Sequence, residues 1–343
     1  MGIEVEHVLS ISHNESKPDN YLRFGKFSPD GSLISTVAND NTLKIFENPV
    51  SPFYTNITNT AISDNLISDE FRDFCWFPRF TFTEEASKCF ALASRGHPVN
   101  LYSTSFKPYF SYKPQDYNGD LAESYTVTFH PLGGMIVIGL KNQIQLFDVI
   151  HSTNPLQILG FGTRKDKGRI GIVSSVSFNV DGRRYLIGTH SGFIALCENT
   201  DYSFLSDPQH KQGGINQLCW VDDNTFLVGS RQDMFIREYD IREGLVARYK
   251  RPSISTQKLP FCTYHAYIIA GTSDSKLQII NRTSNCCDKA YLVDNPCGVC
   301  DIDGNLLLLC TGTRYPSQAT INCEGIELNT CGSRFNLYKL IES

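Results

Sequence analysis

The N-terminal part of the chain alternates hydrophobic and polar residues in short segments that polar turns separate. Residues 27–49 read FSPDGSLISTVANDNTLKIFENP, and the alternating segment LRFGKF comes directly before the turn. Alternation with a period of two residues predicts strands. The turns at Ser28–Gly31 and Asn39–Asn41 contain residue types that tolerate tight-turn backbone conformations. This stretch therefore predicts three antiparallel strands joined by two hairpins.

The same pattern recurs along the rest of the chain. Clear copies cover residues 125–148, 173–198, 215–240 and 260–281, and looser copies begin at FRDFCWFPRF and CGVCDIDGNLLLLCTGT. The third strands of the copies end at Phe46, Tyr102, Phe147, Cys197, Tyr239, Ile280 and Tyr338. Seven copies of about 49 residues suit the four-stranded blades of a β-propeller. Tyr239 and Asp240 stand where WD-repeat proteins place Trp-Asp.

The repeat predicts an all-β fold, a seven-bladed WD-repeat β-propeller that forms a single domain over residues 1–343. Residues 1–12 also alternate, and we expect this segment to pair with the last blade, closing the ring and hiding unpaired strand edges. No segment has the competing 3.6-residue period of a helix. The expected blades are approximately 20–60, 70–115, 122–162, 170–208, 213–252, 258–290 and 294–343.

Composition narrows the functional classes. The chain has 343 residues, of which 41% are hydrophobic, and this is ample for a large core. It contains no apolar run of about 18 residues and no basic-then-apolar start, so we expect no membrane partner and an intracellular protein. The segment GFGTRK at 160–165 lacks the third glycine of a dinucleotide loop, and the histidines lack metal-ligand spacing. The expectation is a protein that is not an enzyme and has no cofactor.

Twelve cysteines need an explanation, and seven of them follow residue 285. Cys297 and Cys300 form a CxxC pair, but a zinc site needs four ligands at defined spacing. Cys286 and Cys287 would be a poor second pair, because adjacent side chains of a strand point to opposite faces. We interpret most of the cysteines as free thiols that are buried in a protein of a reducing compartment. The CxxC pair falls where the innermost strand of blade 7 is expected, so we interpret it as buried thiols of that strand, with a metal or redox site as the alternative.

The formal net charge is −5, yet basic residues concentrate on one predicted face. In a propeller, that face carries the turns between second and third strands and the connections between blades. The cations expected there include Arg95, Lys141, Arg164, Lys165, Lys167, Arg169, Lys211, Arg231, Lys250, Arg251 and Lys258. Such a basic mouth would attract phosphate groups, and Tyr249 or nearby aromatic rings could stack on a base. Acidic protein tails would fit as well, and ordinary solvated loop charges are the simplest alternative.

Several stretches resemble the telomerase Cajal body protein family, whose members are WD-repeat proteins that bind small Cajal-body RNAs. The similar stretches run in order over about 22–313 and include NYLRFGKFSPDG, FRDFCWF, SRGHPVNLYS, KGRIGIVSSVSFN, HKQGGINQLCW, GSRQDMFIREYDIRE and STQKLPF. The elements QGGI and SRGHP are the more specific ones. The chain departs from the family at Lys211, which precedes QGG where the family has histidine.

The resemblance implies a non-enzymatic adaptor that recognises H/ACA-type small Cajal-body RNAs, or telomerase RNA, and supports localisation or assembly of small nuclear ribonucleoproteins. It implies H/ACA ribonucleoprotein proteins as partners and a nuclear location, in Cajal bodies or nucleoplasm, with a cytoplasmic pool left open. We expect a monomer. The RNA-binding residues expected from the basic mouth and the matched motifs are Arg95, Lys165, Lys167, Arg169, Lys211, Gln212, Gly213, Gly214, Arg231, Gln257 and Lys258.

Roles for these residues follow from their chemistry, and each has an alternative. Arg95 and Arg231 could fork onto a phosphate or a guanine edge, and Gln257 could read a base edge. Gly213 and Gly214 would let backbone approach a base, or would simply make a tight connection between blades. Arg231 could instead form a structural pair with Asp233 or with a neighbouring blade. The alternative function is a protein–protein scaffold in nuclear ribonucleoprotein or splicing assembly, without direct RNA contact.

Overall fold

The computed structural model is built almost entirely from strands. It describes the chain except residues 1, 15–19, 55–60, 68, 152, 162–170, 199–200, 206–212, 254–257, 294–296, 312–319, 323–324, 328–332 and 343. The one helix among the described residues is a single 3-10 turn, η1 (Glu85–Ser87). Accordingly, no described helix has the length and apolar character needed to cross a membrane.

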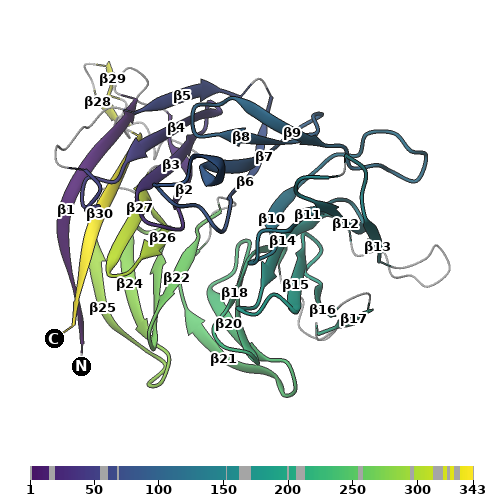
Figure 1. Ribbon diagram of the computed structural model, residues 1–343. Helices are drawn as coiled ribbons and strands as arrows, with labels where there is room; N and C mark the ends of the chain where they lie inside the picture. Colours follow the sequence, from purple (N-terminus) through teal and green to yellow (C-terminus); the bar gives the residue numbers. More distant parts are fainter. Residues whose placement is uncertain are drawn as a thin grey trace. The chain divides into compact units, whose positions relative to one another are not determined.

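Seven four-stranded antiparallel sheets follow one another in the described part of the chain (Figure 1). This is the fold of a seven-bladed WD-repeat β-propeller, so the predicted fold class is confirmed. The chain divides into two compact units, each with more contacts inside it than to the other. The first unit consists of Met1–Leu66 together with Tyr249–Ser343, and the second is Ile67–Arg248. The first unit holds blades 1, 6 and 7, and the second holds blades 2 to 5.

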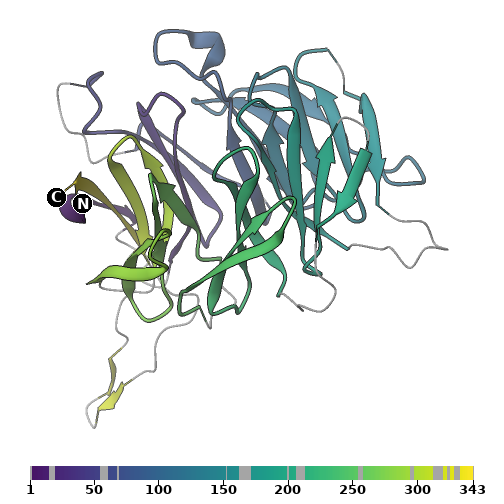
Figure 2. The same ribbon diagram turned by 90° about the horizontal axis from the view of Figure 1, so that it is seen from below.

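The strands of the first unit are as follows. Blade 1 consists of β2 (Leu22–Phe27), β3 (Leu33–Ala38), β4 (Thr42–Glu47) and β5 (Ser63–Leu66). Blade 6 consists of β22 (Phe261–Tyr264), β23 (Tyr267–Gly271), β24 (Lys276–Asn281) and β25 (Cys286–Leu292). Blade 7 consists of β26 (Cys297–Asp303), β27 (Leu306–Thr311), β30 (Ser333–Glu342) and β1 (Ile3–Asn14). The small hairpin of β28 (Thr320–Asn322) and β29 (Gly325–Glu327) belongs to none of these sheets (Figure 2).

The strands of the second unit follow the same plan. Blade 2 consists of β6 (Phe71–Trp76), β7 (Cys89–Ser94), β8 (Val99–Ser103) and β9 (Pro108–Tyr112). Blade 3 consists of β10 (Thr126–Phe129), β11 (Met135–Gly139), β12 (Gln143–Asp148) and β13 (Gln157–Gly160). Blade 4 consists of β14 (Val173–Phe178), β15 (Arg184–Thr189), β16 (Ile194–Glu198) and β17 (Asp201–Phe204). Blade 5 consists of β18 (Ile215–Trp220), β19 (Thr225–Ser230), β20 (Phe235–Asp240) and β21 (Gly244–Lys250).

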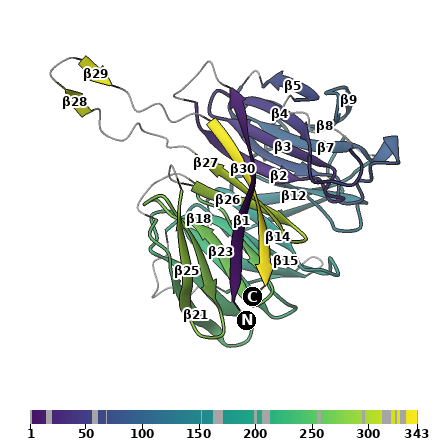
Figure 3. The same cartoon turned by 90° about the vertical axis from the view of Figure 1, so that its left-hand side faces the viewer.

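The N-terminal segment closes the last blade, as its alternation predicts. β1 pairs antiparallel with β30 from Ile3, opposite Glu342, to Asn14, opposite Ser333, and Figure 3 shows the two long strands side by side. Ile11 of β1 is 2% exposed and packs in one hydrophobic cluster with Phe335 and Leu337 of β30. Burial of such a side chain contributes about 1.5–3 kcal/mol, so the closing strand is held by packing as well as by hydrogen bonds.

The second strand of a blade is the most hydrophobic because neighbouring sheets cover both of its faces. In β15, Tyr185 and Ile187 pack in one cluster with residues of blade 3, including Val137. The intervening Leu186 packs in another cluster with Ile215 and other residues of blade 5. A strand covered on both faces reads as a continuous apolar run, and this is why the LISTVA-like segments stand out in the sequence.

The first strand of several blades contains a bulge at the same place. The register shifts between Leu22 and Phe24, and the same shift occurs between Phe71 and Asp73, Val173 and Ser175, and Ile215 and Gln217. The extra residues are Arg23, Arg72, Ser174 and Asn216. Bulges re-aim a side chain and recur next to functional sites. These bulges lie at the end of each sheet that carries the turn between its second and third strands.

Candidate functional site

The turn between the second and third strands contacts the segment that enters the same blade. In five blades a residue of this turn donates a backbone hydrogen bond to that segment: Asn39 to Tyr21 (2.8 Å), Arg95 to Glu70 (2.9 Å), His190 to Ile172 (2.9 Å), Arg231 to Gly214 (2.8 Å) and Ser273 to Pro252 (3.0 Å). We call this end of a blade, with its turn and its entering segment, the turn end. Predicted site residues from separate sequence segments therefore meet within single blades.

The turn end of blade 5 brings together three predicted residues, Gly213, Gly214 and Arg231. A Cβ atom on Gly213 would lie 2.2 Å from the carbonyl oxygen of Arg231, and one on Gly214 would lie 2.6 Å from that of His190. Both obstacles are backbone atoms, which cannot swing aside. The glycines are thus required by close packing of the entering segment between two turns, as the tight-connection alternative states.

The side chain of Arg231 is half-buried, and it does not pair with Asp233. The Asp233 carboxylate instead accepts a hydrogen bond from Arg237, and also one from the backbone N–H of Phe235 at 3.1 Å. No ion pair to Arg231 is found within the described part of the chain. The alternative of a structural Arg231–Asp233 pair is therefore wrong.

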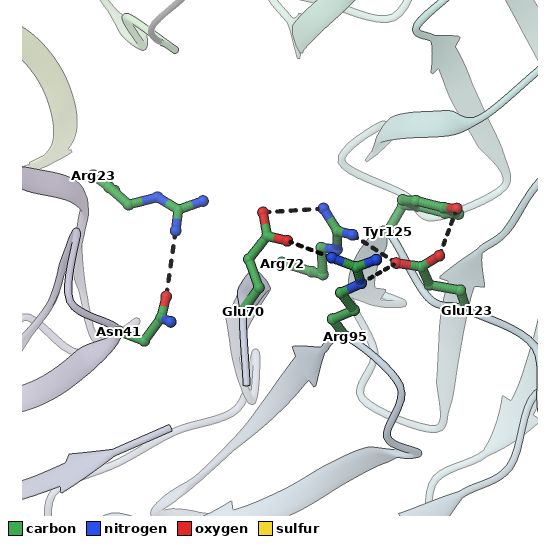
Figure 4. Close-up of polar contacts among 7 residues, drawn as sticks. All are labelled: Arg23, Asn41, Glu70, Arg72, Arg95, Glu123 and Tyr125. Carbon is green, nitrogen blue, oxygen red and sulfur yellow. Dashed lines mark hydrogen bonds and ion pairs between the residues drawn. The ribbon is translucent and has the colours of Figure 1, made fainter. Parts of the chain in front are cut away.

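Blade 2 and the segment entering blade 3 form a network of alternating charges (Figure 4). Arg72, the bulged residue of β6, contacts Glu123 at 2.6 Å (Nη2–Oε1) and Glu70 at 3.3 Å (Nη1–Oε1). Arg95, whose side chain is 65% exposed, lies 3.8 Å from Glu70 (Nη1–Oε2) and 4.0 Å from Glu123 (Nε–Oε1). The Tyr125 hydroxyl donates to Glu123 Oε2 at 2.9 Å. Arg95 is therefore held near two carboxylates, and its long, exposed contacts are weak ones.

The two arginines and two glutamates of this network balance in charge. Burial raises the pKa of the Glu123 carboxyl, but hydrogen bonds from Arg72 and Tyr125 outweigh burial and leave the pKa below its usual value. Glu123 is consequently ionised at neutral pH and competes with any phosphate for Arg72 and Arg95. Sequence reasoning missed Arg72. The available signal was that it occupies the same repeat position as Arg23, whose Nη1 donates to Asn41 Oδ1 at 3.4 Å (Figure 4).

Two residues assigned to the basic mouth lie in the interior instead. Arg251 is 2% exposed, and its Nη1 donates to the carbonyl of Leu259 at 2.6 Å while its guanidinium lies 5.9 Å from the centre of the Phe261 ring. Tyr249 is also 2% exposed. The predictions that Arg251 contributes to a basic surface and that Tyr249 stacks on a base are therefore wrong. Lys141 and Lys258 are exposed, as expected.

The remaining predicted site residues lie outside the described residues. They are Lys165, Lys167, Arg169, Lys211, Gln212 and Gln257, and Arg164 is another basic-mouth residue of this kind. Their role in RNA binding stays a prediction.

The described cysteines are free thiols, but they are not all buried. Cys89, Cys197, Cys262 and Cys310 are buried, whereas Cys75 and Cys219 are half-buried and Cys286 and Cys287 are exposed. Burial raises the pKa of Cys89 and of Cys197 to about 12, so these thiols are inert at neutral pH. No group of three metal-ligating side chains occurs among the residues that the structure describes, which do not include the side chains of Cys297 and Cys300. The expected burial is thus found for Cys89, Cys197, Cys262 and Cys310, whereas Cys286 and Cys287 are exceptions.

Comparison with known proteins supports the repeat and the resemblance. The family model described as WD domain, G-beta repeat matches residues 7–47, which include most of β1 and all of β2, β3 and β4. This repeat unit therefore supplies the outer strand of one blade and three strands of the next.

Three similar proteins are informative. The chain is 25% identical over 251 residues to telomerase Cajal body protein 1 of Mus musculus, covering 70% of this chain and 47% of that protein. It is 24% identical over 242 residues to the Homo sapiens protein of the same name, covering 68% and 44%. It is also 24% identical over 248 residues to guanine nucleotide-binding protein negative regulator 1 of Schizosaccharomyces pombe, covering 68% and 62%.

The match thus extends over less than half the length of the mouse and human proteins. The sequence motifs, the blade architecture and these matches agree with one another. The chain is a WD-repeat β-propeller protein that resembles the telomerase Cajal body protein family.

Proposed function

We propose that this protein is a non-enzymatic RNA-binding adaptor. It recognises small nuclear RNAs of the H/ACA or Cajal-body type through the turn ends of its blades, and it supports localisation or assembly of small nuclear ribonucleoproteins. The similarity to telomerase Cajal body protein 1, whose name connects it with telomerase and with Cajal bodies, supports a nuclear role of this kind. H/ACA ribonucleoprotein proteins are the expected protein partners.

The main support for the proposal is the arrangement of residues at the turn end of blade 5. Arg231 presents a guanidinium that has no ion-pair partner in the described part of the chain, and Gly213 and Gly214 pack directly against its backbone. A guanidinium forms two parallel hydrogen bonds with a phosphate, which makes arginine well suited to nucleic acids. The adjacent predicted residues Lys211 and Gln212 would extend this contact along the RNA backbone.

The scaffold function remains the second candidate, and the network in blade 2 favours it. Because Glu70 and Glu123 balance Arg72 and Arg95, this part of the surface has no net positive charge to attract phosphates. A protein segment with both signs of charge would fit such a surface as well as RNA does. The two functions differ in their dependence on salt.

Salt titration of purified protein with an H/ACA-type small RNA tests the proposal. Binding through phosphate contacts predicts a linear fall of log affinity with log salt concentration. Arg231→Ala should lower affinity roughly tenfold and reduce the salt slope by about 0.7, the value for one contact on a single strand. Arg242→Ala is the matched control, because Arg242 lies at the opposite end of the same blade, after β20.

Two results would contradict the proposal. One is the absence of specific RNA binding at low salt, and the other is an equal effect of the Arg231 and Arg242 substitutions. Salt-insensitive capture of protein partners would then favour the scaffold.

A further inference from the structure

A pocket of about 690 Å³ lies in the Ile67–Arg248 unit, between the segment that enters blade 3 and the turn between β11 and β12. Asp116, Tyr117, Leu121 and Glu123 line it from the entering segment, and Lys141 and Asn142 line it from the turn. The volume is within the range of small-molecule sites. The pocket shares Glu123 with the charge network of blade 2, so it adjoins the turn end of that blade.

Two large apolar groups of the pocket are unusually exposed. Tyr117 is 79% exposed and Leu121 is 46% exposed, although both line a concave site. An exposed tyrosine ring offers a face for stacking at a low entropy cost, and base–aromatic stacking contributes substantially to binding of single strands. The pocket is therefore suited to a planar guest.

The charges of the pocket favour a guest whose inserted part is neutral. Its charged lining residues are Asp116, Glu123 and Lys141, and Glu123 is already compensated by Arg72. Asp116 and Lys141 then balance each other. A neutral ring that carries hydrogen-bond donors and is attached to a phosphate would match both residues, since the donors suit Asp116 and the phosphate suits Lys141.

Asp116 is held in place by its own turn. Its Oδ1 accepts hydrogen bonds from the backbone N–H groups of Asn118 (2.8 Å) and Asp120 (3.0 Å), and its backbone N–H donates to the Asp120 carbonyl at 2.9 Å. The second carboxylate oxygen, Oδ2, remains as an acceptor on a fixed side chain. Such preorganisation gives a hydrogen bond at little entropic cost.

We propose that this pocket receives one guanine base of a bound single-stranded RNA. Guanine is the base that presents two adjacent donors, N1–H and the 2-amino group, and these suit a carboxylate acceptor. Asp116 accepts from that edge, Tyr117 stacks on the ring, and Lys141 contacts the attached phosphate. This inference rests on the proposed RNA-binding function and adds a base preference to it.

The test compares two short RNAs, an octamer of uridine and the same octamer with one central guanosine, by fluorescence anisotropy. Wild-type protein should bind the guanosine-containing RNA roughly tenfold more tightly, as expected for a good carboxylate–base contact. Asp116→Asn retains the turn, since the amide oxygen still accepts the two N–H groups, and it should make the affinities for the two octamers equal. Tyr117→Ala should weaken binding of the guanosine octamer roughly tenfold.

Matched controls separate the pocket from general surface effects. Asp181→Asn alters a turn aspartate that also accepts a backbone N–H, from Arg183, and Tyr109→Ala alters a 45% exposed tyrosine on β9. Both should keep the guanosine preference. Replacing guanosine by inosine, which lacks the 2-amino group, should reduce the preference in wild type and have no effect in Asp116→Asn.

Equal affinity of wild type for the two octamers, with tight binding of an H/ACA-type RNA retained, would overturn the pocket assignment alone. Failure to bind any RNA would overturn the proposed function and the pocket together. Loss of the preference in Asp181→Asn as well would also contradict the assignment, because the effect would not be specific to the pocket.

Discussion

Replacing Gly213 by alanine tests whether this glycine is a packing requirement of blade 5. A Cβ atom at this position would lie 2.2 Å from the carbonyl oxygen of Arg231, and Cβ atoms in proteins essentially never come within 3.0 Å of another group. The entering segment would have to move away from the turn by about 0.8 Å. That movement strains the hydrogen bond from the Arg231 N–H to the Gly214 carbonyl, which is 2.8 Å long.

The expected cost is the sum of two effects. Overpacking against backbone costs about 1–3 kcal/mol. Weakening one backbone hydrogen bond adds about 0.5–1.5 kcal/mol. We therefore expect Gly213→Ala to lower the free energy of unfolding by about 1.5–4.5 kcal/mol.

Urea unfolding followed by tryptophan fluorescence measures this loss, with Gly160→Ala as the matched control. Gly160 is in β13, and no atom lies within 4 Å of a Cβ built there, so the control should leave stability nearly unchanged. Equal stability of the two variants would refute the packing argument. Weaker RNA binding by Gly213→Ala at unchanged stability would show that the glycine serves ligand approach instead.

The other predictions concern pH, charge and closure. Burial lowers the pKa of His13 to about 4, so the unfolded chain binds the proton more tightly and stability falls as the pH drops from about 6.5 to 4. The free energy of unfolding, measured with urea, should fall by about 3 kcal/mol over this pH range, and His13→Gln should not show this fall. A stability difference between the two proteins that does not change with pH would contradict the prediction. Glu123→Gln frees Arg72 and Arg95 from a carboxylate and should raise RNA affinity several-fold in anisotropy titrations, whereas Glu243→Gln, which alters a distant turn, should not. Ile11→Ala removes a buried contact between β1 and β30, so it should lower the free energy of unfolding, measured with urea, by about 2–5 kcal/mol. A loss below about 0.5 kcal/mol would show that packing of β1 does not contribute to closing blade 7.

The blade architecture could be predicted because it depends on local patterns. Alternation in LRFGKF and the polar turn at Asn39–Asn41 appear where the structure has β2 and the β3–β4 turn. The closing role of β1 followed from an alternating segment that no other blade required. These features depend on periodicity and turn chemistry, which can be read from neighbouring residues.

The details of the candidate site depend on contacts between distant segments and were not predictable in the same way. The position of Arg251 after a strand suggested an exposed cation, but its side chain turns inward to the Leu259 carbonyl. Glu123 neutralises Arg72 across 51 positions of sequence, and neither residue alone reveals the pair. In the sequence, Arg72 and Arg23 only occupy the same position of two repeats. The strand register is needed to show that both are the extra residue of a β-bulge.

Crosslinking the protein to RNA in living cells, followed by purification and sequencing of the bound RNA, tests the central claim most directly. The account predicts strong enrichment of H/ACA-type small nuclear RNAs, with the enrichment reduced for Arg231→Ala and retained for Arg242→Ala. Recovery of no small RNA above background from well-folded wild-type protein would contradict it.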